Sequence, residues 1–208
     1  MPKTPLSKVI AVLRAPSADR YRPVVDELVA GGVREIELTL TTPGTLDVVG
    51  RLRADVGEVA RIGVGTVTDG VRARAALDAG AQFLVTPGVV RGAAEPAREH
   101  GVPVIMGALT PTEVMTATAS GADLVKIFPA SAVGAEYLGQ LRGPFPDLRA
   151  VPSGGIGAAK ARAWLAAGAA AVSMGGPLIG DALNGGSLRA LTDRIRRLAE
   201  EIGEDVST

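Results

Sequence analysis

The stretch DGVRARAALDAGAQFLVTP (residues 69–87) contains a predicted helix followed directly by a predicted strand. The segment at 69–80 is rich in Arg, Ala and Leu at helical spacing, and Thr68 or Asp69 can cap its start. It ends in Ala-Gly, and glycine is favoured where a helix ends. Residues 82–87 then form a short apolar run bounded by Thr and Pro, which is typical of a buried strand.

This helix–strand unit recurs along the whole chain. The candidate strands are residues 8–14, 34–40, 61–67, 82–87, 102–107, 123–128, 148–153 and 170–175. They are continuous apolar runs, as expected of parallel strands covered on both faces. Roughly eight such units in 208 residues predict an α/β protein with one domain, a (β/α)8 TIM barrel over residues 1–208. An open doubly wound sheet is the alternative.

Composition narrows the range of functions. Lys plus Arg and Asp plus Glu both number 22, so nothing points to nucleic acid. The chain has no cysteine and one histidine, His100, which is predicted to be solvated at a helix end. We therefore expect no metal site and no metal cofactor. The N-terminal apolar run is too short to cross a membrane and lacks a small-residue cleavage site, so a soluble, cytoplasmic protein is expected.

GADLVKIFPA (121–130) places Lys126 inside an apolar strand. Side chains alternate along a strand, so Lys126 and Phe128 face the same side. Burying an ammonium group is costly unless it is paired or becomes neutral. A desolvated lysine can attack a carbonyl carbon to form a Schiff base. The alternative is a lysine paired with a carboxylate in the core.

REIELTL (34–40) supplies a carboxylate for either reading, since Glu35, Glu37 and Thr39 share one face of the predicted strand. We expect Glu35 to be solvated at the bottom rim. Glu37 lies farther up the strand, where it would be a partner of Lys126 or a general acid/base. A purely structural ion pair is the alternative.

Two glycine pairs follow the last two predicted strands, in VPSGGI (151–156) and MGGPLIG (174–180). Backbone N–H groups before a helix can bind an anion, and TIM barrels often hold a phosphate at this position. The candidate phosphate-binding residues are Ser153, Gly154, Gly155, Gly175 and Gly176. Plain tight turns are the alternative.

Three further residues fall at predicted strand ends. Arg14 in LRAP (13–16) suits a bidentate contact with a carboxylate or a phosphate, or a surface ion pair. Thr66 in GTVTD (65–69) is a candidate hydrogen-bonding group for a substrate. Pro87 in VTPG (85–88) lies at the mouth of the fourth strand, where a simple turn is the alternative.

These motifs together resemble a known family. VLRAP, GGVREIELTLTTP, GVGTVTD, FLVTPG, MGALTPTEV, DLVKIFPA, LRGPFPDLRAVPSGGI and AVSMGGPLIG occur in this order. They are similar to the bacterial 2-keto-3-deoxy-6-phosphogluconate (KDPG) aldolases, also called 4-hydroxy-2-oxoglutarate aldolases. The resemblance spans residues 8–180, and the E-x-T, G-x-G-T-V and K-x-F-P motifs are its most specific parts.

The resemblance implies a class I aldolase on a small barrel, without metal or organic cofactor and commonly homotrimeric. It implies cleavage of KDPG to pyruvate and glyceraldehyde 3-phosphate. Lys126 matches the Schiff-base lysine and Glu37 the general acid/base. The remaining matches are Thr66 and Pro87 near the pyruvyl part, Phe128 beside the lysine, Arg14 near the carboxylate, and Gly154 and Gly155 at the phosphate.

The chain departs from the family pattern at three positions. Thr41 stands where some members have a carboxylate-binding arginine, which shifts that role toward Arg14 and backbone amides. Ser153 replaces a threonine, and Gly176 replaces a serine that donates to the phosphate.

Rival functions remain open from the sequence. A sister aldolase acting on the galactonate epimer, or on unphosphorylated 4-hydroxy-2-oxoglutarate, would use the same lysine. A sugar-phosphate isomerase or epimerase would use Glu37 as a base without covalent chemistry. A non-catalytic barrel that binds a phosphorylated ligand is the last possibility.

Overall fold

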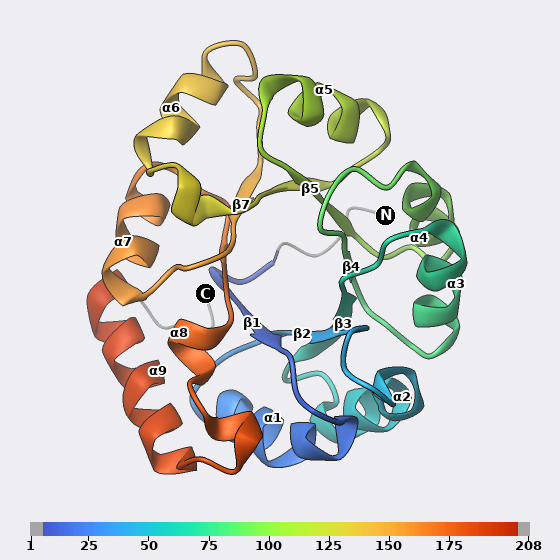
Figure 1. The fold of residues 1–208 in the computed structure, drawn as a ribbon, viewed down its shortest axis with the longest axis vertical. Coiled ribbons are helices and arrows are strands. Elements are labelled where there is room, and N and C mark those ends of the chain that lie inside the picture. The colour runs from blue at the N-terminus through green and yellow to red at the C-terminus, as the bar shows by residue number, and fades with distance from the viewer. Residues whose placement is uncertain (1–5, 204–208) are drawn as a thin grey trace.

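The computed structural model describes residues 6–203, in which strands and helices alternate around a closed ring (Figure 1). The strands are β1 Val9–Leu13, β2 Glu35–Thr39, β3 Arg61–Gly65, β4 Leu84–Val85, β5 Val104–Ala108, β6 Leu124–Ile127, β7 Ala150–Pro152 and β8 Val172–Met174. The α-helices are α1 Tyr21–Ala30, α2 Thr45–Val56, α3 Gly70–Asp78, α4 Ala94–Glu99, α5 Pro111–Ala119, α6 Glu136–Arg142, α7 Ala158–Ala166, α8 Gly176–Ile179 and α9 Leu188–Ile202. Short 3-10 turns are η1 Ala18–Arg20, η2 Arg91–Ala93, η3 Ala130–Ala132 and η4 Ala182–Asn184.

All neighbouring strands pair in parallel, in the order β7-β6-β5-β4-β3-β2-β1-β8. A bridge between Ser153 and Ser173 joins the two ends of this sheet and closes the ring. The predicted (β/α)8 barrel is therefore confirmed, and the open doubly wound alternative is wrong. None of the described helices combines the length and apolar composition needed to span a bilayer.

The starts of α3 and α5 carry the predicted side-chain caps, whereas α1, α2, α4, α6, α7 and α8 begin without one. The Asp69 carboxylate accepts a hydrogen bond from the Arg72 backbone N–H at 2.8 Å, which caps α3 as expected. Thr110 and Glu113 form a reciprocal capping box at the start of α5. His100 is the exposed C-cap of α4, as predicted. The predicted tail beyond the last helix falls partly outside the described residues, which end at 203.

Element boundaries differ from the predictions by one to two residues at most ends. The largest relative difference is at β4, which is only Leu84–Val85 instead of residues 82–87. Apolar runs extend past the paired residues because the strand ends are also buried by the neighbouring helices and loops. Hydropathy alone therefore overestimates the length of strands in a closed barrel.

Two apolar layers hold the barrel together. The larger layer lies between the strands and the surrounding helices. The smaller layer fills the barrel interior with Ile10, Phe83, Val85, Ile105, Leu124, Val151 and Ala171, together with partly buried Leu6 and Ala170. Because side chains alternate, this inner set defines which strand positions point inward, and Lys126 shares the parity of Leu124.

Glycines on β3 make room in the interior for large neighbours. A Cβ on Gly63 would overlap with the Phe83 ring, and a Cβ on Gly65 would overlap with the Glu37 carboxylate. Because the interior is closely packed, it cannot hold a side chain at either glycine in addition to the Phe83 ring and the Glu37 carboxylate. The pattern G-x-G on β3 therefore lets an aromatic ring and a carboxylate lie across this strand.

Glu35 corrects one prediction, because it is 2% exposed and not solvated at the rim. Arg61, its register partner on β3, donates from Nε to both carboxylate oxygens at 3.0 and 3.1 Å. The Ser7 backbone N–H donates to Oε1 at 3.2 Å. Burial raises the pKa of Glu35, and the hydrogen bonds and charge of Arg61 oppose that rise. Strand register, which places Arg61 beside Glu35, is not visible in a hydropathy pattern.

Candidate active site

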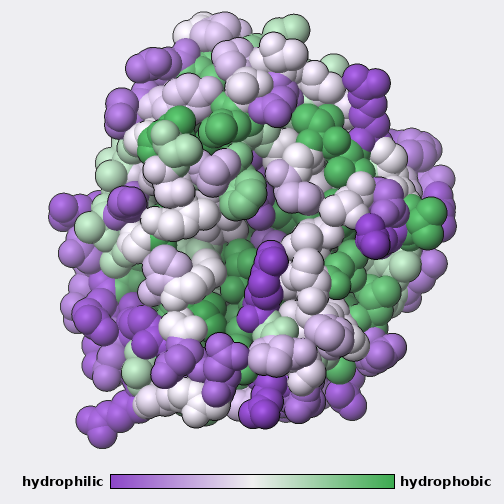
Figure 2. All heavy atoms as spheres, in the orientation of Figure 1, coloured by the Kyte–Doolittle hydropathy of each residue, from purple (hydrophilic) through white to green (hydrophobic). Residues whose placement is uncertain are grey.

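A cavity of about 350 Å³ opens at the carboxyl ends of the strands, where TIM barrels carry their active sites. Its lining combines residues from β1, β2 and β6 with the loops after β3, β7 and β8. These are Val12, Arg14, Glu37, Thr66, Lys126, Phe128, Ser153, Gly154, Gly155, Gly175, Gly176, Pro177, Ile179, Gly180, Leu183 and Asn184. In Figure 2 this face has a largely hydrophilic outline, with pale and green atoms around its centre.

Lys126 lies on β6 with its side chain about 10% exposed. Its Nζ is 5.4 Å from the centre of the Phe128 ring, within the range of a cation–π contact. Its register neighbours are Gly107 on β5 and Val151 on β7, neither of which carries a charge. The two neighbouring strands therefore place no charged residue in register with Lys126.

Glu37 reaches the same point from β2, on the opposite side of the barrel in the strand order. Its Oε1 lies 3.9 Å from Lys126 Nζ, which is close enough for charge attraction and too far for a hydrogen bond. Its Oε2 is buried, and among the described residues no group donates a hydrogen bond to it. The carboxylate is thus placed toward the amine without being tied to it.

Thr66, at the end of β3, has a strained backbone with φ of +59°. A β-branched residue in the left-handed region is a genuine outlier, and such outliers concentrate at functional sites. The Thr66 hydroxyl oxygen lies 3.5 Å from Arg14 Nη2, at the limit of a hydrogen bond. The strain turns the hydroxyl into the mouth of the barrel.

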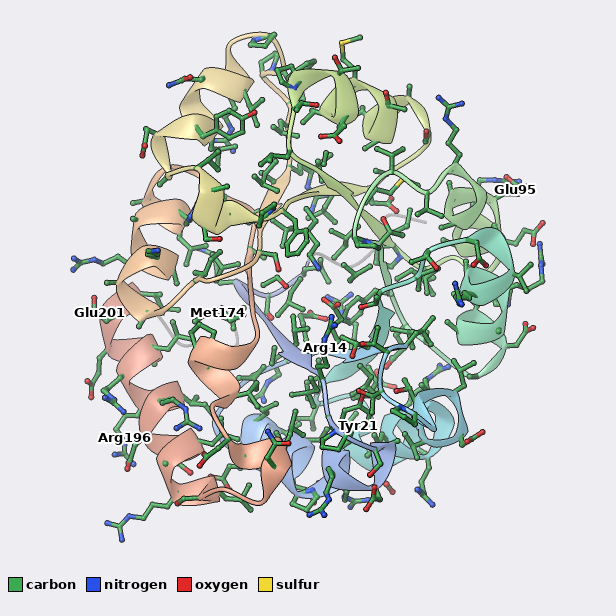
Figure 3. All side chains as sticks on the ribbon, in the orientation of Figure 1. Arg14, Tyr21, Glu95, Met174, Arg196 and Glu201 are labelled. Carbon is green, nitrogen blue, oxygen red and sulfur yellow. The ribbon has the colours of Figure 1, made fainter. Side chains whose placement is uncertain are left out.

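Buried hydroxyl groups fix the loop that carries Arg14. Thr42 Oγ1 accepts a hydrogen bond from the Ala15 backbone N–H at 2.9 Å, joining the loops after β1 and β2. The hydroxyl groups of Tyr21 and Thr45, which are both buried, form a hydrogen bond of 3.2 Å. Figure 3 shows Arg14 over the barrel, whereas Glu95, Arg196 and Glu201 lie on the outer ring of helices.

The loop after β7 requires glycine at two positions, with φ of +94° at Gly154 and +70° at Gly155. A Cβ at Gly154 would lie 3.1 Å from the Phe128 ring. Ser153 Oγ is buried and lies 3.2 Å from Ser173 Oγ on β8. The loop is therefore more than a turn, since it brings bare backbone beside the cavity.

The structure gathers the predicted site residues, with Pro87 as the exception. Pro87 is exposed and does not line this cavity, and its backbone instead packs against Gly107. Sequence reasoning overlooked Gly65, whose inward position in the G-x-G pattern could have revealed it. It also overlooked the wall formed by Pro177, Ile179, Gly180, Leu183 and Asn184, for which the strand pattern holds no signal.

A closed (β/α)8 barrel with a buried lysine and a buried carboxylate at its mouth is typical of enzymes whose lysine amine acts as a nucleophile. Residues 3–192 match the family model described as KDPG and KHG aldolase. The chain therefore belongs to the KDPG/KHG aldolase family, whose members are aldehyde-lyases.

Three known proteins show the extent of the similarity. The KHG/KDPG aldolase of Escherichia coli K12 is 35% identical over 198 residues, or 94% of this chain and 91% of that protein. A structure of native KDPGal has a TM-score of 0.89 at 27% identity and covers both chains completely. The Legionella pneumophila KDPG aldolase, with pyruvate captured at low pH as a covalent carbinolamine, has a TM-score of 0.84 at 27% identity, covering 92% of this chain and 94% of that one.

Proposed function

We propose that this enzyme is a class I aldolase that cleaves KDPG to pyruvate and glyceraldehyde 3-phosphate through a Schiff base on Lys126. One observation carries the proposal: the buried Lys126 amine opens onto the cavity, 3.9 Å from a Glu37 carboxylate that it does not hydrogen-bond. A structural ion pair in this position would be expected to satisfy its buried oxygens. The similarity to KDPG aldolases, one of which holds pyruvate covalently, supports the same chemistry.

The first half of the reaction forms the covalent link. The Lys126 amine attacks the C2 ketone of the substrate in its deprotonated form, with loss of its proton to a base, and gives a carbinolamine. Loss of water from the carbinolamine then leaves a protonated imine. The positive nitrogen can accept the electron pair of the bond that is about to break.

Glu37 performs the proton transfers of the second half. Its carboxylate removes the proton from the C4 hydroxyl, directly or through a water molecule, and the C3–C4 bond breaks. Glyceraldehyde 3-phosphate leaves as the aldehyde, and the electron pair remains on the pyruvate enamine. Glu37 returns a proton to C3, and water then releases pyruvate and the free Lys126 amine.

The two ends of the substrate find complementary groups around the cavity. Arg14 and Thr66, whose side chains lie 3.5 Å apart, are suited to the carboxylate. Pro87 lies outside the cavity lining, so we assign it no contact with the substrate. The glycine loops at Ser153–Gly155 and Gly175–Gly176 offer backbone N–H groups to the phosphate.

A sister activity on the galactonate epimer is the second candidate, because a native KDPGal structure superposes at a TM-score of 0.89. Both activities share Lys126 and Glu37 and differ only in how the C4 hydroxyl is held. An isomerase or a non-catalytic binding barrel would leave the amine of Lys126 unmodified throughout.

Kinetics with KDPG, its C4 epimer and 4-hydroxy-2-oxoglutarate test the proposal, with pyruvate release followed by a coupled dehydrogenase. We expect the highest kcat/KM for KDPG and no measurable turnover in Lys126→Ala. Lys160→Ala, on the exposed face of α7, is the matched control and should keep normal rates. A Lys126→Ala variant with near-normal rates would overturn the assignment of the lysine, and a preference for the epimer would move the proposal to the sister activity.

We further propose that the enzyme acts in the cytoplasm as a homotrimer, in line with the family resemblance. Light scattering coupled to size-exclusion chromatography should give the mass of three chains. A monomeric mass at working concentrations would contradict the trimer.

A further inference from the structure

Asn184 is a polar residue of the cavity that no sequence motif singled out. It is the last residue of η4, in the segment between β8 and α9, and it is one of the residues that line the cavity containing Lys126. Among the described residues, no group forms a hydrogen bond with its side-chain amide. The amide is therefore available to a ligand.

Asn184 is the one residue with a polar side chain among the described residues that line the cavity after β8. The wall after β8 consists otherwise of Gly175, Gly176, Pro177, Ile179, Gly180 and Leu183. Asn184 thus supplies the side-chain donor that this wall would otherwise lack.

The segment holding Asn184 is firmly anchored although the residue itself is exposed. Leu178 and Leu183 are buried on either side of the turn. Arg194 on α9 donates to the Leu178 and Ile179 carbonyl oxygens at 2.6 and 2.7 Å. The Asn184 backbone N–H donates to the Asp181 carbonyl oxygen at 2.8 Å. These contacts fix the backbone that carries Asn184, so binding a ligand costs little backbone conformational entropy.

An uncharged amide in this position suits an anionic ligand group. Its NH2 offers two donors, and its carbonyl adds no full negative charge. Hydrogen bonds to charged groups are stronger than those between neutral groups. The two glycine loops that share the cavity supply backbone donors for the same group.

We propose that the Asn184 side-chain amide binds the phosphate end of the substrate and sets the preference for phosphorylated over unphosphorylated 2-keto acids. This inference rests on the proposed aldolase function, since it assigns one end of that substrate. It makes Asn184 the side-chain donor of the cavity wall that follows β8.

The main test compares two substrates in two variants. In Asn184→Ala we expect kcat/KM for KDPG to fall about 10- to 100-fold, mostly through KM, because a hydrogen bond to a charged group is lost. For 4-hydroxy-2-oxoglutarate, which lacks the phosphate, kcat/KM should change less than about twofold. Asn184→Asp keeps the size of the side chain and adds a negative charge. Its kcat/KM should fall further than that of Asn184→Ala for KDPG, and should not fall for 4-hydroxy-2-oxoglutarate. Gln140→Ala removes an exposed amide on α6 and is the matched control.

Equal losses for both substrates, or no loss for either, would overturn the role of Asn184. Two measurements separate this failure from failure of the aldolase function. Borohydride trapping of pyruvate does not require a phosphate, so an adduct on the Lys126 peptide tests the Schiff base independently of Asn184. Calorimetric titration with inorganic phosphate requires no turnover, and Asn184→Ala should weaken phosphate binding about tenfold or more. Unchanged phosphate affinity in that variant contradicts the proposal whatever reaction the enzyme catalyses.

Discussion

At the scale of single residues, the burial of Lys126 and Glu37 lowers the stability of the fold. Glu37 is 1% exposed and keeps one carboxylate oxygen without a partner among the described residues. A buried unsatisfied polar atom costs about 1–3 kcal/mol. The 3.9 Å separation from the amine recovers only part of this through charge attraction. This arrangement is expected of a pair that serves the proposed proton transfer and is not expected of a pair that only stabilises the fold.

Replacing Glu37 by glutamine should separate bond formation from proton transfer. We expect kcat of Glu37→Gln to fall about 10²- to 10⁴-fold, because the general acid/base is lost. The variant should still form a reducible adduct with pyruvate, since Lys126 remains. Steady-state kinetics and mass spectrometry after borohydride treatment measure the two effects. Wild-type turnover in this variant would remove Glu37 from the mechanism.

Thr66 offers a direct measurement of strain at the site. At φ of +59°, glycine relieves backbone strain that both threonine and alanine must bear. We expect Thr66→Gly to be about 1 kcal/mol more stable than Thr66→Ala in urea unfolding, although both lose the hydroxyl. Both variants should bind pyruvate more weakly. If the glycine variant is the less stable of the two, Thr66 is not strained in solution.

At the scale of elements, the β2–β3 pair shows how strand alternation builds the site. Glu35, Glu37 and Thr39 on β2 face inward, opposite Arg61, Gly63 and Gly65 on β3. Both inward carboxylates depend on residues of β3. The Arg61 guanidinium pairs with Glu35, and the absence of a side chain at Gly65 leaves room for the Glu37 carboxylate. Glu35 and Arg61 form an ion pair toward the amino ends of the strands, whereas Glu37 is left facing the cavity.

Gly65→Ala tests this accommodation. The new Cβ would overlap with the Glu37 carboxylate and displace it. Misplacing a catalytic group by about 1 Å can cost about 100-fold in rate, so we expect kcat to fall by at least that factor. Gly139→Ala on α6, where a Cβ meets no atom within 4 Å, is the control and should retain full activity. Normal kcat in Gly65→Ala would show that Glu37 does not need this position.

Sequence patterns predicted these elements better than their mutual register. The apolar runs identified all eight strands, and alternation correctly placed Lys126 and Glu37 on the inner face. The burial of Glu35 was missed because it depends on Arg61 in a neighbouring strand. The positive φ of Thr66 and the position of Asn184 were also missed. Both depend on loop geometry, which leaves no periodic trace in the sequence.

At the scale of the whole molecule, the barrel separates stability from chemistry along its axis. Ile10, Phe83, Ile105 and Leu124 fill its interior, and Glu35 with Arg61 lies toward the amino ends of the strands. Reactive groups lie toward the carboxyl ends, where the loops that bind substrate can vary without disturbing the core. The fold could be predicted from the strand count, and the site from Lys126, Glu37 and the glycine pairs.

The buried Glu35 should leave a signature in the pH dependence of stability. Its pKa is raised above the ordinary value of 4.5, mainly by burial, so the folded state holds its proton more tightly than the unfolded state. Its contribution to stability is therefore complete below about pH 4.5 and is lost as pH rises through the raised pKa.

Glu35→Gln isolates this effect from the other carboxyl groups. Urea midpoints measured at several pH values should show the stability of the wild type falling, relative to the variant, as pH rises from about 4.5. Parallel curves for the two proteins would mean that burial does not raise the pKa of Glu35.

The central claim is that Lys126 forms a covalent bond with a 2-keto acid, and trapping with pyruvate tests it most directly. The protein is incubated with pyruvate, reduced with borohydride, digested and analysed by peptide mass spectrometry. The account predicts irreversible inactivation, with a reduced pyruvyl group on the peptide that contains Lys126 and no adduct in Lys126→Ala. An unmodified Lys126 peptide, or an adduct confined to another lysine, would contradict it.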